Sequence, residues 1–230
     1  MEELSSALIE ELECKVVFRI PIFGGIPVTE SVLVSWVIMA VIVLLCIIFV
    51  RNLKKVPTKK QAGIEMLIGW LNNFFLDITG EKGRKHLPFL GTLIIYIAFA
   101  NLAGLFGLRP PTKDINVTIA LAVVSTTYIQ ICSIRAKGTK KWLKHFKEPM
   151  PILLPINLLE LIIRPLSLCA RLFGNILGAF IVMELIKLCI PVGVPVIFGL
   201  YFDIFDGLIQ AYVFVFLSSL FLSEALEAEH

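Results

Sequence analysis

Residues 155–180 read PINLLELIIRPLSLCARLFGNILGAF, an apolar stretch that nevertheless carries charged side chains. An arginine at the centre of a membrane-spanning helix costs about 2.5–3.5 kcal/mol on insertion scales, so charges at this depth usually mark an ion or substrate path. At about 100° per residue, the polar side chains of the stretch fall on one face of a helix. They are Glu160, Arg164, Ser167, Arg171 and Asn175. The remaining Leu, Ile and Phe side chains suit lipid or neighbouring helices.

The two arginines of this stretch differ in their local partners. Glu160 and Arg164 are four positions apart and can pair on one helix face, so a purely structural role stays open for both. Arg171 has no acidic residue three or four positions away, so its partner must come from elsewhere. Gly174 and Gly178 give the helix an edge of small residues, where another helix can approach closely. The pattern indicates docking against a partner that brings its own carboxylates.

The composition is that of a membrane protein. Of the 230 residues, 57% are hydrophobic and 17% charged, which fits a multi-pass membrane protein and not a soluble domain. The net charge of +3 gives no case for nucleic acid binding. The five cysteines are scattered without a CxxC pair, so we expect neither a metal site nor a disulfide framework. The sequence has no Walker loop, GxSxG or HExxH motif, so we expect no cofactor and no catalytic residues.

Apolar runs and basic clusters predict one all-α polytopic membrane domain over residues 1–230. After an outer segment at 1–31, the expected crossings are residues 32–50, 87–108, 115–134, 152–190 and 196–222. Residues 63–78 have apolar side chains at helical spacing with polar ones between them, which predicts a helix lying along the membrane interface. Lys and Arg cluster at 51–60, 82–85 and 135–147, which predicts the N-terminus outside and the C-terminus in the cytoplasm.

The last two segments are long for upright spans. Residues 152–190 would form a helix of roughly 58 Å, nearly twice a hydrocarbon core of about 30 Å. No polar turn follows Pro165 until the sequence PVGVP at 191–195. We therefore expect about five membrane-crossing helices, of which the last two are long and steeply tilted.

The run RPLSLCARLFGN at 164–175 closely resembles the signature of subunit a of F-type ATP synthases, the stator half of a rotary ion channel. A second match is Gln210-Ala211 in the last apolar segment, and a third lies within residues 101–118. The resemblance covers roughly residues 100–230. It implies that the two long helices face the ring of c subunits, with Arg171 opposite the carboxylates of that ring.

The resemblance also implies two offset half-channels separated by Arg171, with Asn175 and Gln210 flanking the arginine. The family often has a titratable residue at the position of Phe180, and this chain departs from that pattern. We therefore expect the outer half-channel to use three acidic residues: Asp203, Glu184 and Asp206. The inner half-channel is expected to use four polar residues: Glu160, Ser167, Asn101 and Asn157. Plainer roles stay open, because Glu184 can pair with Lys187 and Asn101 can bond to a neighbouring helix.

The function implied by the resemblance is that of an ion-channel stator that couples ion flow to ATP synthesis. Such a chain is not an enzyme on its own. Its expected partners are the c-ring, the peripheral-stalk b subunits, indirectly the catalytic head, and the lipid bilayer of a bacterial plasma membrane. The expected ion is the proton, and sodium stays open because of Phe180. The alternative is a self-contained secondary transporter with a substrate site at Arg171, although this chain shows no internal repeat.

Overall fold

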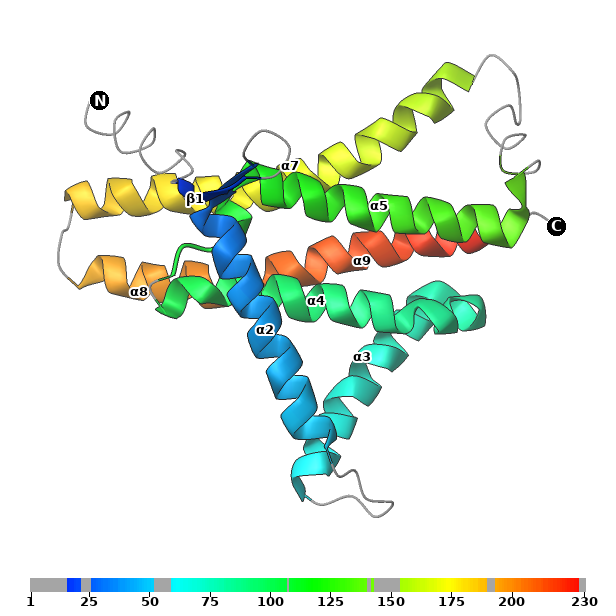
Figure 1. The fold of residues 1–230 in the computed structure, drawn as a ribbon, viewed down its shortest axis with the longest axis horizontal. Helices are drawn as coiled ribbons and strands as arrows, with labels where there is room; N and C mark the ends of the chain where they lie inside the picture. The colour runs from blue at the N-terminus through cyan, green and yellow to red at the C-terminus, as the bar shows by residue number, and fades with distance from the viewer. Residues whose placement is uncertain are drawn as a thin grey trace. The chain divides into compact units, whose positions relative to one another are not determined.

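The computed structural model describes residues 16–21, 26–51, 59–106, 108–139, 142, 154–189 and 193–227. Most of these residues are helical, which confirms the expected fold class (Figure 1). The helices in chain order are α2 (Glu30–Val50), α3 (Lys59–Gly83), α4 (Leu87–Leu102), α5 (Ile115–Lys137), α7 (Leu154–Cys189), α8 (Val194–Leu200) and α9 (Gly207–Leu226). Shorter helical turns are η1 (Arg84–His86), η2 (Ala103–Phe106), η3 (Pro111–Lys113) and η5 (Tyr201–Asp206).

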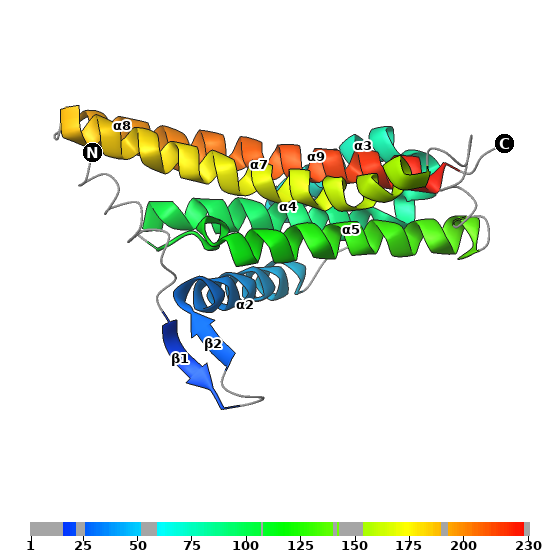
Figure 2. The same cartoon turned by 90° about the horizontal axis from the view of Figure 1, so that it is seen from above.

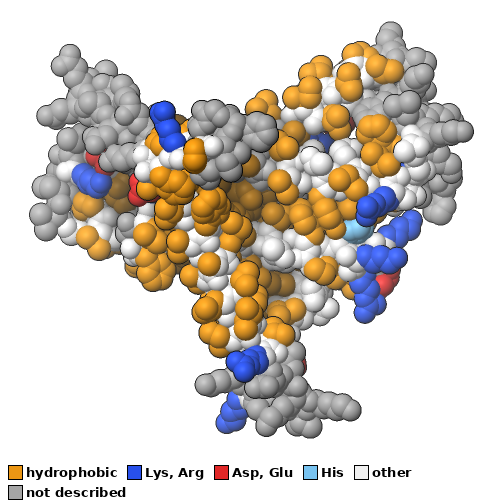
Figure 3. All heavy atoms as spheres, viewed as in Figure 1, with side chains coloured by type: hydrophobic (Ala, Val, Ile, Leu, Met, Phe, Trp, Pro, Cys, Tyr) orange, Lys and Arg blue, Asp and Glu red, His pale blue; other side chains and the backbone are white. Residues whose placement is uncertain are grey.

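Within the described residues, five helical segments are long and apolar enough to cross a membrane, as the sequence predicts. They are Glu30–Val50, Gln61–Phe106, Ile115–Lys137, Leu154–Lys187 and Pro195–Leu226. Helix α2 has most of its apolar side chains on the surface, and Figure 3 shows hydrophobic side chains along it. Soluble proteins rarely expose apolar patches of this size, whereas lipid or partner helices would cover them.

A short hairpin precedes α2. Strand β1 (Val16–Ile20) pairs antiparallel with β2 (Ile26–Thr29), which leads directly into the helix (Figure 2). Val28 is buried, and Thr29 Oγ1 donates a 3.4 Å hydrogen bond to Asp114 Oδ2, so the end of the hairpin is anchored. The sequence predicts no secondary structure here, because strands of five and four residues are too short to show a clear alternation.

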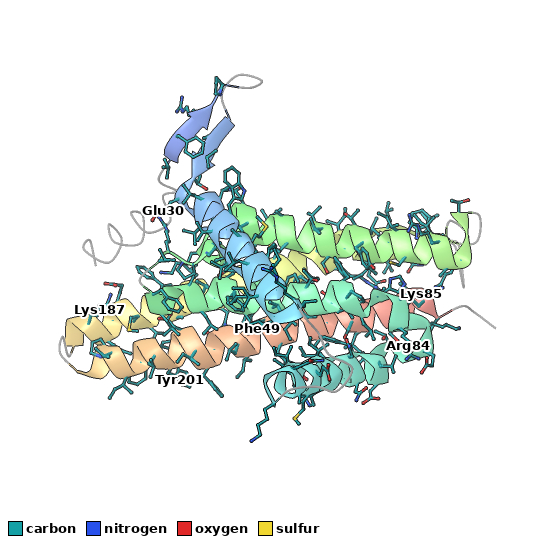
Figure 4. All side chains as sticks on the ribbon, turned by 60° about the horizontal axis from the view of Figure 1, so that its bottom comes forward. Glu30, Phe49, Arg84, Lys85, Lys187 and Tyr201 are labelled. Atoms are coloured by element: carbon teal, nitrogen blue, oxygen red, sulfur yellow. The ribbon has the colours of Figure 1, made fainter. Side chains whose placement is uncertain are left out.

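Helix α3 contains the segment at 63–78 for which an interfacial helix is expected. It breaks at Gly80, whose φ of 64° is a left-handed conformation that glycine adopts without strain. Arg84 and Lys85 follow at the exposed corner before α4 (Figure 4). Large apolar side chains such as Met66 and Trp70 are exposed along α3. Its position at a membrane interface stays a prediction.

The long helix expected over 152–190 is present as α7, a single helix of 36 residues that continues through Pro165. The segment expected as one helix over 196–222 consists of α8, the π-helical turn η5 and α9. Hydropathy predicts that such a segment is helical, but it does not predict where the winding changes. π-Helical turns are rare and are frequent at functional sites. This one contains Asp203 and Asp206.

The chain forms two compact units, and the long helices contribute residues to both. Unit 1 comprises Met1–Val41, Tyr96–Leu121 and Cys169–Tyr212, and unit 2 comprises Ile42–Ile95, Ala122–Leu168 and Val213–His230. In unit 1 the chain turns at Gly193, and α8 runs back antiparallel to the second part of α7 (Figure 1). Leu172 and Ala211 belong to the buried core of this unit.

Unit 2 is built from the second part of α2, from α3, and from parts of α4, α5, α7 and α9. Its core contains side chains that are at most 1% exposed, among them Phe75, Leu90, Leu168, Phe214 and Leu222. Polar side chains on these apolar helices find partners on other helices. Ser125 Oγ donates a 3.0 Å hydrogen bond to Ser218 Oγ, and His86 Nδ1 lies 2.9 Å from Tyr128 Oη. Such pairs are typical of helix packing in membranes.

Candidate functional site

Unit 1 contains a cavity of about 340 Å³, bounded by the segment before α5, the second part of α7, η5 and the start of α9. Figure 4 marks two of these elements by Lys187 on α7 and Tyr201 on η5. The charged side chains that line the cavity are Lys113, Glu184, Lys187, Asp203 and Asp206. Three amides line it as well: Asn101, Asn175 and Gln210. Polar and charged groups are costly among membrane helices, so this cluster is a candidate functional site.

The three acidic residues expected on the outer path all line this cavity, but their partners differ. Glu184 Oε1 accepts a 2.6 Å hydrogen bond from Lys187 Nζ, so the simple ion pair is present. Asp206 Oδ2 accepts a 2.9 Å hydrogen bond from Asn175 Nδ2. Within the described part of the chain, the Asp203 carboxyl makes no hydrogen bond. Asp203 therefore differs from the other two acids of this cavity, whose carboxylates both accept a hydrogen bond.

Close contacts fix the position of Asp203. A Cβ added to Gly104 would lie 3.0 Å from Asp203 Oδ1, so glycine leaves the space that the carboxyl occupies. Lys113 lines the same cavity as Asp203. Lys113 Nζ also lies 5.4 Å from the centroid of the Phe180 ring, within the range of a cation–π interaction. The position where the resemblance implies a titratable side chain thus holds a phenyl ring beneath a lysine.

Amide groups connect α7 to α9 within unit 1. Asn175 Nδ2 lies 3.4 Å from Gln210 Oε1, in addition to its shorter bond to Asp206. Gln210 is 5% exposed, and its buried Nε2 has no hydrogen-bond partner among the described residues. A buried donor without a partner costs about 1–3 kcal/mol, and native proteins contain few of them. The donor is therefore available to a group outside the described residues.

Arg171 lies on α7, one turn before Asn175, and its side chain is exposed. No hydrogen bond or ion pair engages its guanidinium within the ranges that the structure describes. The neighbouring Leu172 is fully buried, so Arg171 points away from the core of unit 1. Gly174 and Gly178 are also exposed, and a Cβ added to either would meet no atom within 4 Å. These three residues share a face of α7 that the described chain leaves uncovered.

Asn101 is expected on the inner path from the sequence, but the structure groups it with the outer residues. Its side chain lines the unit 1 cavity, where Nδ2 donates a 2.7 Å hydrogen bond to Gly207 O and Oδ1 accepts one of 2.8 Å from Thr112 Oγ1. A Cβ at Gly207 would lie 3.0 Å from Asn101 Cβ, so the two helices approach closely here. The plainer reading, an amide that bonds to a neighbouring helix, is thus observed. The structure thus places Asn101 in the unit 1 cavity and not beside Glu160, because α4 brings it to the segment before α5.

Unit 2 contains a cavity of about 260 Å³. Glu160 and Asn157 line it, as two of the residues expected on the inner path, together with Arg164 and Glu224. Arg164 Nη2 donates hydrogen bonds of 2.8 Å to both Glu160 Oε1 and Glu224 Oε1, and its guanidinium carbon lies 4.8 Å from the centroid of the Phe221 ring. Ser167 is exposed on α7 and does not line this cavity. The pairing of Glu160 with Arg164 is therefore present and extends to a third charged group.

Lys113 and Glu224 are among the charged residues of these cavities that are absent from the expected set. Lys113 belongs to a turn, where no helical periodicity relates it to its neighbours. Glu224 belongs to the acidic end of the chain, which reads as a polar tail. Helical spacing offers a signal for Glu224, because it follows Gln210 by about four turns and therefore lies on the same side of that helix. Sequence offers no comparable signal for Lys113.

The fold and these cavities define a multi-pass helical membrane protein with charged side chains on its membrane-spanning helices. Residues 32–223 match the family described as the ATP synthase A chain. The chain belongs to this family, whose members are membrane subunits of ATP synthases that take part in ion transport and ATP synthesis. Its partners are accordingly other subunits of that complex.

Curated relatives match nearly the whole chain. ATP synthase subunit a of Solidesulfovibrio magneticus is 36% identical over 214 residues, which cover 91% of this chain and 89% of the relative. The subunit a of Moorella thermoacetica is 34% identical over 87% of this chain and 92% of its own length. The protein described as ATP synthase subunit a, sodium ion specific, of Propionigenium modestum is 30% identical over 90% of this chain and 77% of its own length.

Proposed function

We propose that this chain is the stator ion-channel subunit of a rotary F-type ATP synthase. In this proposal two half-channels carry ions to and from the carboxylates of a c-ring, so that ion flow drives rotation and ATP synthesis. The observation that carries the proposal is Arg171. Its guanidinium is exposed on an apolar helix and has no partner in the described chain, beside two glycines that leave the helix face open. A charge placed in this way is costly unless a partner brings carboxylates to it.

We assign the outer half-channel to the cavity of unit 1. Asp203 is the entry carboxyl, because it lacks a hydrogen bond in the described chain, and Glu184 and Asp206 support it as further acidic groups of the wall. Asn101 joins this group on the basis of its contacts with Gly207 and Thr112. Carboxyl groups suit this task because they can accept and release a proton as charges move nearby.

We assign the inner half-channel to the cavity of unit 2. Glu160 and Asn157 line it, and Ser167 extends the polar face of α7 toward Arg171. Arg164 pairs with both Glu160 and Glu224 and holds α7 and α9 side by side within the unit. Lys137 also lines this cavity, so two cationic groups balance the two carboxylates, and a cation leaving the c-ring meets acids that are paired and not a bare arginine.

Arg171 has two tasks in this mechanism. Its fixed positive charge favours the ionised form of an approaching c-ring carboxylate, which therefore releases its ion. The same charge repels cations that would otherwise pass from one half-channel to the other. Asn175 and Gln210 flank the arginine and orient it by hydrogen bonds. An arginine suits this exchange better than a lysine, because its planar guanidinium stays charged and offers several donors to successive carboxylates.

The proposal also assigns the subunits that surround this chain and the membrane in which it lies. The c-ring covers the face of α7 that carries Arg171, the b subunits of the peripheral stalk hold the chain still, and the catalytic head makes ATP. The chain has no catalytic residues of its own in this scheme. It lies in the plasma membrane of a bacterium, with its N-terminus outside and its C-terminus in the cytoplasm, because the basic clusters of the sequence lie on one side.

The first prediction tests Arg171 in vesicles that contain the assembled complex. Arg171→Ala should leave the c-ring bound, reduce ion-driven ATP synthesis to the background rate and raise the passive ion leak, since no charge separates the half-channels. Arg171→Lys keeps the charge, so its ion leak should be smaller than that of Arg171→Ala. It should still lose most of the ATP synthesis.

Arg84→Ala is the matched control, because Arg84 is exposed at the corner before α4 and pairs only weakly with Glu81 at 3.6 Å. It removes the same charge and should keep synthesis at the wild-type rate. Wild-type synthesis in an assembled Arg171→Ala complex would falsify the proposed function.

A further inference from the structure

Unit 2 carries basic side chains at the corner where α3 leads into α4. Lys82, Arg84 and Lys85 are exposed there, and Figure 3 shows Lys and Arg side chains gathered in this part of the chain. Glu81 lies 3.6 Å from Arg84, but the two side chains are 76% and 72% exposed, so water screens the pair strongly. No ion pair engages Lys82 or Lys85 within the described residues. The corner therefore has a positive charge that the described chain leaves largely unbalanced.

The end of α5 brings a further cation to this corner. His86 Nδ1 lies 2.9 Å from Tyr128 Oη and 3.5 Å from Cys132 Sγ, so the residue that follows Lys85 contacts α5 directly. Arg135 lies about one turn beyond Cys132, is exposed, and makes no ion pair in the part of the chain that the structure describes. The exposed charged side chains described here are four cations, Lys82, Arg84, Lys85 and Arg135, and two acids, Asp77 and Glu81.

An exposed apolar face of α5 leads up to Arg135. Val124, Tyr128, Ile131 and Arg135 follow at alternating steps of four and three residues, so they share one face of the helix. Val124 is 55% exposed and Ile131 is 43% exposed. The Phe89 ring of α4 stacks on the Tyr128 ring with 3.7 Å between their centroids. Helices α4 and α5 thus present an apolar surface that ends in positive charge.

We propose that this surface binds an anionic phospholipid. We call it the lipid surface and define it by Lys85, Phe89, Val124, Ile131 and Arg135. The cations hold the phosphate of the headgroup, and an acyl chain lies along Val124 and Ile131. The proposal needs only a chain that lies in a membrane, so it does not depend on the path that ions take.

The position of the cations on their helices supports a lipid as the occupant. Helix α5 is a candidate membrane span that ends at Lys137, so Arg135 lies at its border, where the hydrocarbon core gives way to headgroups. Lys85 comes just before α4, at the corresponding end of another apolar helix. A phospholipid joins an apolar chain to a phosphate, which matches both parts of this surface. An acidic protein segment would match the cations alone.

The charge balance predicts a preference among lipids. An arginine can donate two parallel hydrogen bonds to a phosphate, and a lysine adds a compact positive charge. Phosphatidylglycerol has a net negative charge that four cations and two acids attract. Phosphatidylcholine carries its own cation beside the phosphate, so its net attraction is weaker. We therefore expect the lipid surface to select phosphatidylglycerol from a mixture of the two.

The test measures lipid contact directly in the whole ATP synthase complex in vesicles of phosphatidylcholine. Phosphatidylglycerol and phosphatidylcholine with the same photoactivatable acyl chain are added separately in equal small amounts, and the crosslinks on α5 are mapped by mass spectrometry. The wild-type chain should be labelled around Val124 and Ile131 more strongly by phosphatidylglycerol. A basic side chain near an anionic lipid surface contributes roughly fivefold in affinity, so Lys85→Gln and Arg135→Gln should each reduce the preference about fivefold.

Matched variants separate charge from structure. Lys85→Arg and Arg135→Lys keep the charge and should keep the preference. Arg19→Gln removes an exposed charge from β1 of unit 1 and should also leave it unchanged. Excess soluble glycerol phosphate should not displace the lipid, because it cannot use the apolar face.

Equal labelling of the wild-type chain by the two lipids would overturn the proposal, as expected if a partner subunit covers the cations. A full preference in assembled Lys85→Gln and Arg135→Gln complexes would overturn it too, and so would displacement by glycerol phosphate. Ion-driven synthesis is not measured in this experiment, so its outcome is separate from that of the proposed function.

Discussion

Gln210 shows how a single side chain can be suited to function and not to stability. Its amide nitrogen is buried without a hydrogen-bond partner among the described residues, and its oxygen accepts only the 3.4 Å bond from Asn175. Leucine is close to glutamine in size and would remove the unpaired donor. The fold of this chain alone therefore gives no reason for a glutamine at this position, whereas a glutamine that orients Arg171 would be required by the transport mechanism.

The second prediction follows for Gln210→Leu. The free energy of unfolding should stay within about 1 kcal/mol of the wild-type value, because the variant loses a weak hydrogen bond and an unsatisfied donor together. Ion-driven ATP synthesis per assembled complex should nevertheless fall. Thermal denaturation of the purified complex and synthesis in vesicles measure the two effects.

Ser218→Ala on the same helix is the matched control. It leaves the buried Ser125 hydroxyl without its 3.0 Å acceptor, so stability should fall by about 1 kcal/mol or more while synthesis per complex is kept. A Gln210→Leu complex that behaves in this way would contradict the orienting role.

The sequence predicts the site at the residue scale only where a helix fixes the spacing. Glu184, Asp203 and Asp206 come together in one cavity because they lie on two helices joined by a short turn. Asn101, which is expected with Glu160, lies with these three acids instead. Tertiary packing at the end of α4 determines its neighbours, and the sequence pattern does not show that packing. Lys113 was not predicted for the same reason, because a residue in a turn has no periodic relation to the residues it meets.

At the scale of elements, α7 has an uncovered face that carries a charged side chain. Arg171, Gly174 and Gly178 are exposed on it, and added Cβ atoms at the glycines meet nothing within 4 Å. Glycine costs a helix about 1 kcal/mol relative to alanine, so two glycines here are unfavourable unless a partner needs the space. The proposed c-ring is that partner, and close approach of small residues is a common way for membrane helices to pack.

The third prediction concerns Gly178→Val. The chain itself should fold as well as the wild type, because the added methyl groups enter open space. In the complex they would occupy the gap toward the c-ring, so ion-driven synthesis and co-purification of the c-ring should both decrease. Gly69→Val on α3 is the control, since an added Cβ there also meets no atom within 4 Å and should leave both measurements unchanged. Equal behaviour of the two variants would mean that no c subunit approaches Gly178.

The helices, the hairpin and the π-helical turn form for different physical reasons. The sequence predicts only those elements whose cause is a long apolar run. Helices such as α2 and α7 follow from long apolar runs, which have few alternatives in a membrane. The hairpin of β1 and β2 and the π-helical turn η5 depend on short-range geometry and on packing against other segments. Hydropathy contains no signal for either, so both were found only in the structure.

At the scale of the whole molecule, the number of crossings is the property that the sequence predicts best. Five apolar segments correspond to the five candidate spans of the structure, because a hydrocarbon core of about 30 Å imposes a minimum length on each. Which parts of these segments assemble into each unit could not be predicted. Unit 1 and unit 2 each combine three stretches that are distant in sequence, and side-chain complementarity decides such contacts.

The fourth prediction concerns the orientation of the molecule in the membrane. An odd number of crossings and basic clusters on one side predict opposite locations for the two ends of the chain. Val17 on β1 and Glu227 after α9 are exposed, so cysteines at these positions should be accessible to a reagent. In a background without the five native cysteines, a membrane-impermeant maleimide should label Val17→Cys in intact cells and Glu227→Cys only after permeabilisation. Val17→Cys in permeabilised cells controls for reactivity, and labelling of both sites in intact cells would exclude five crossings.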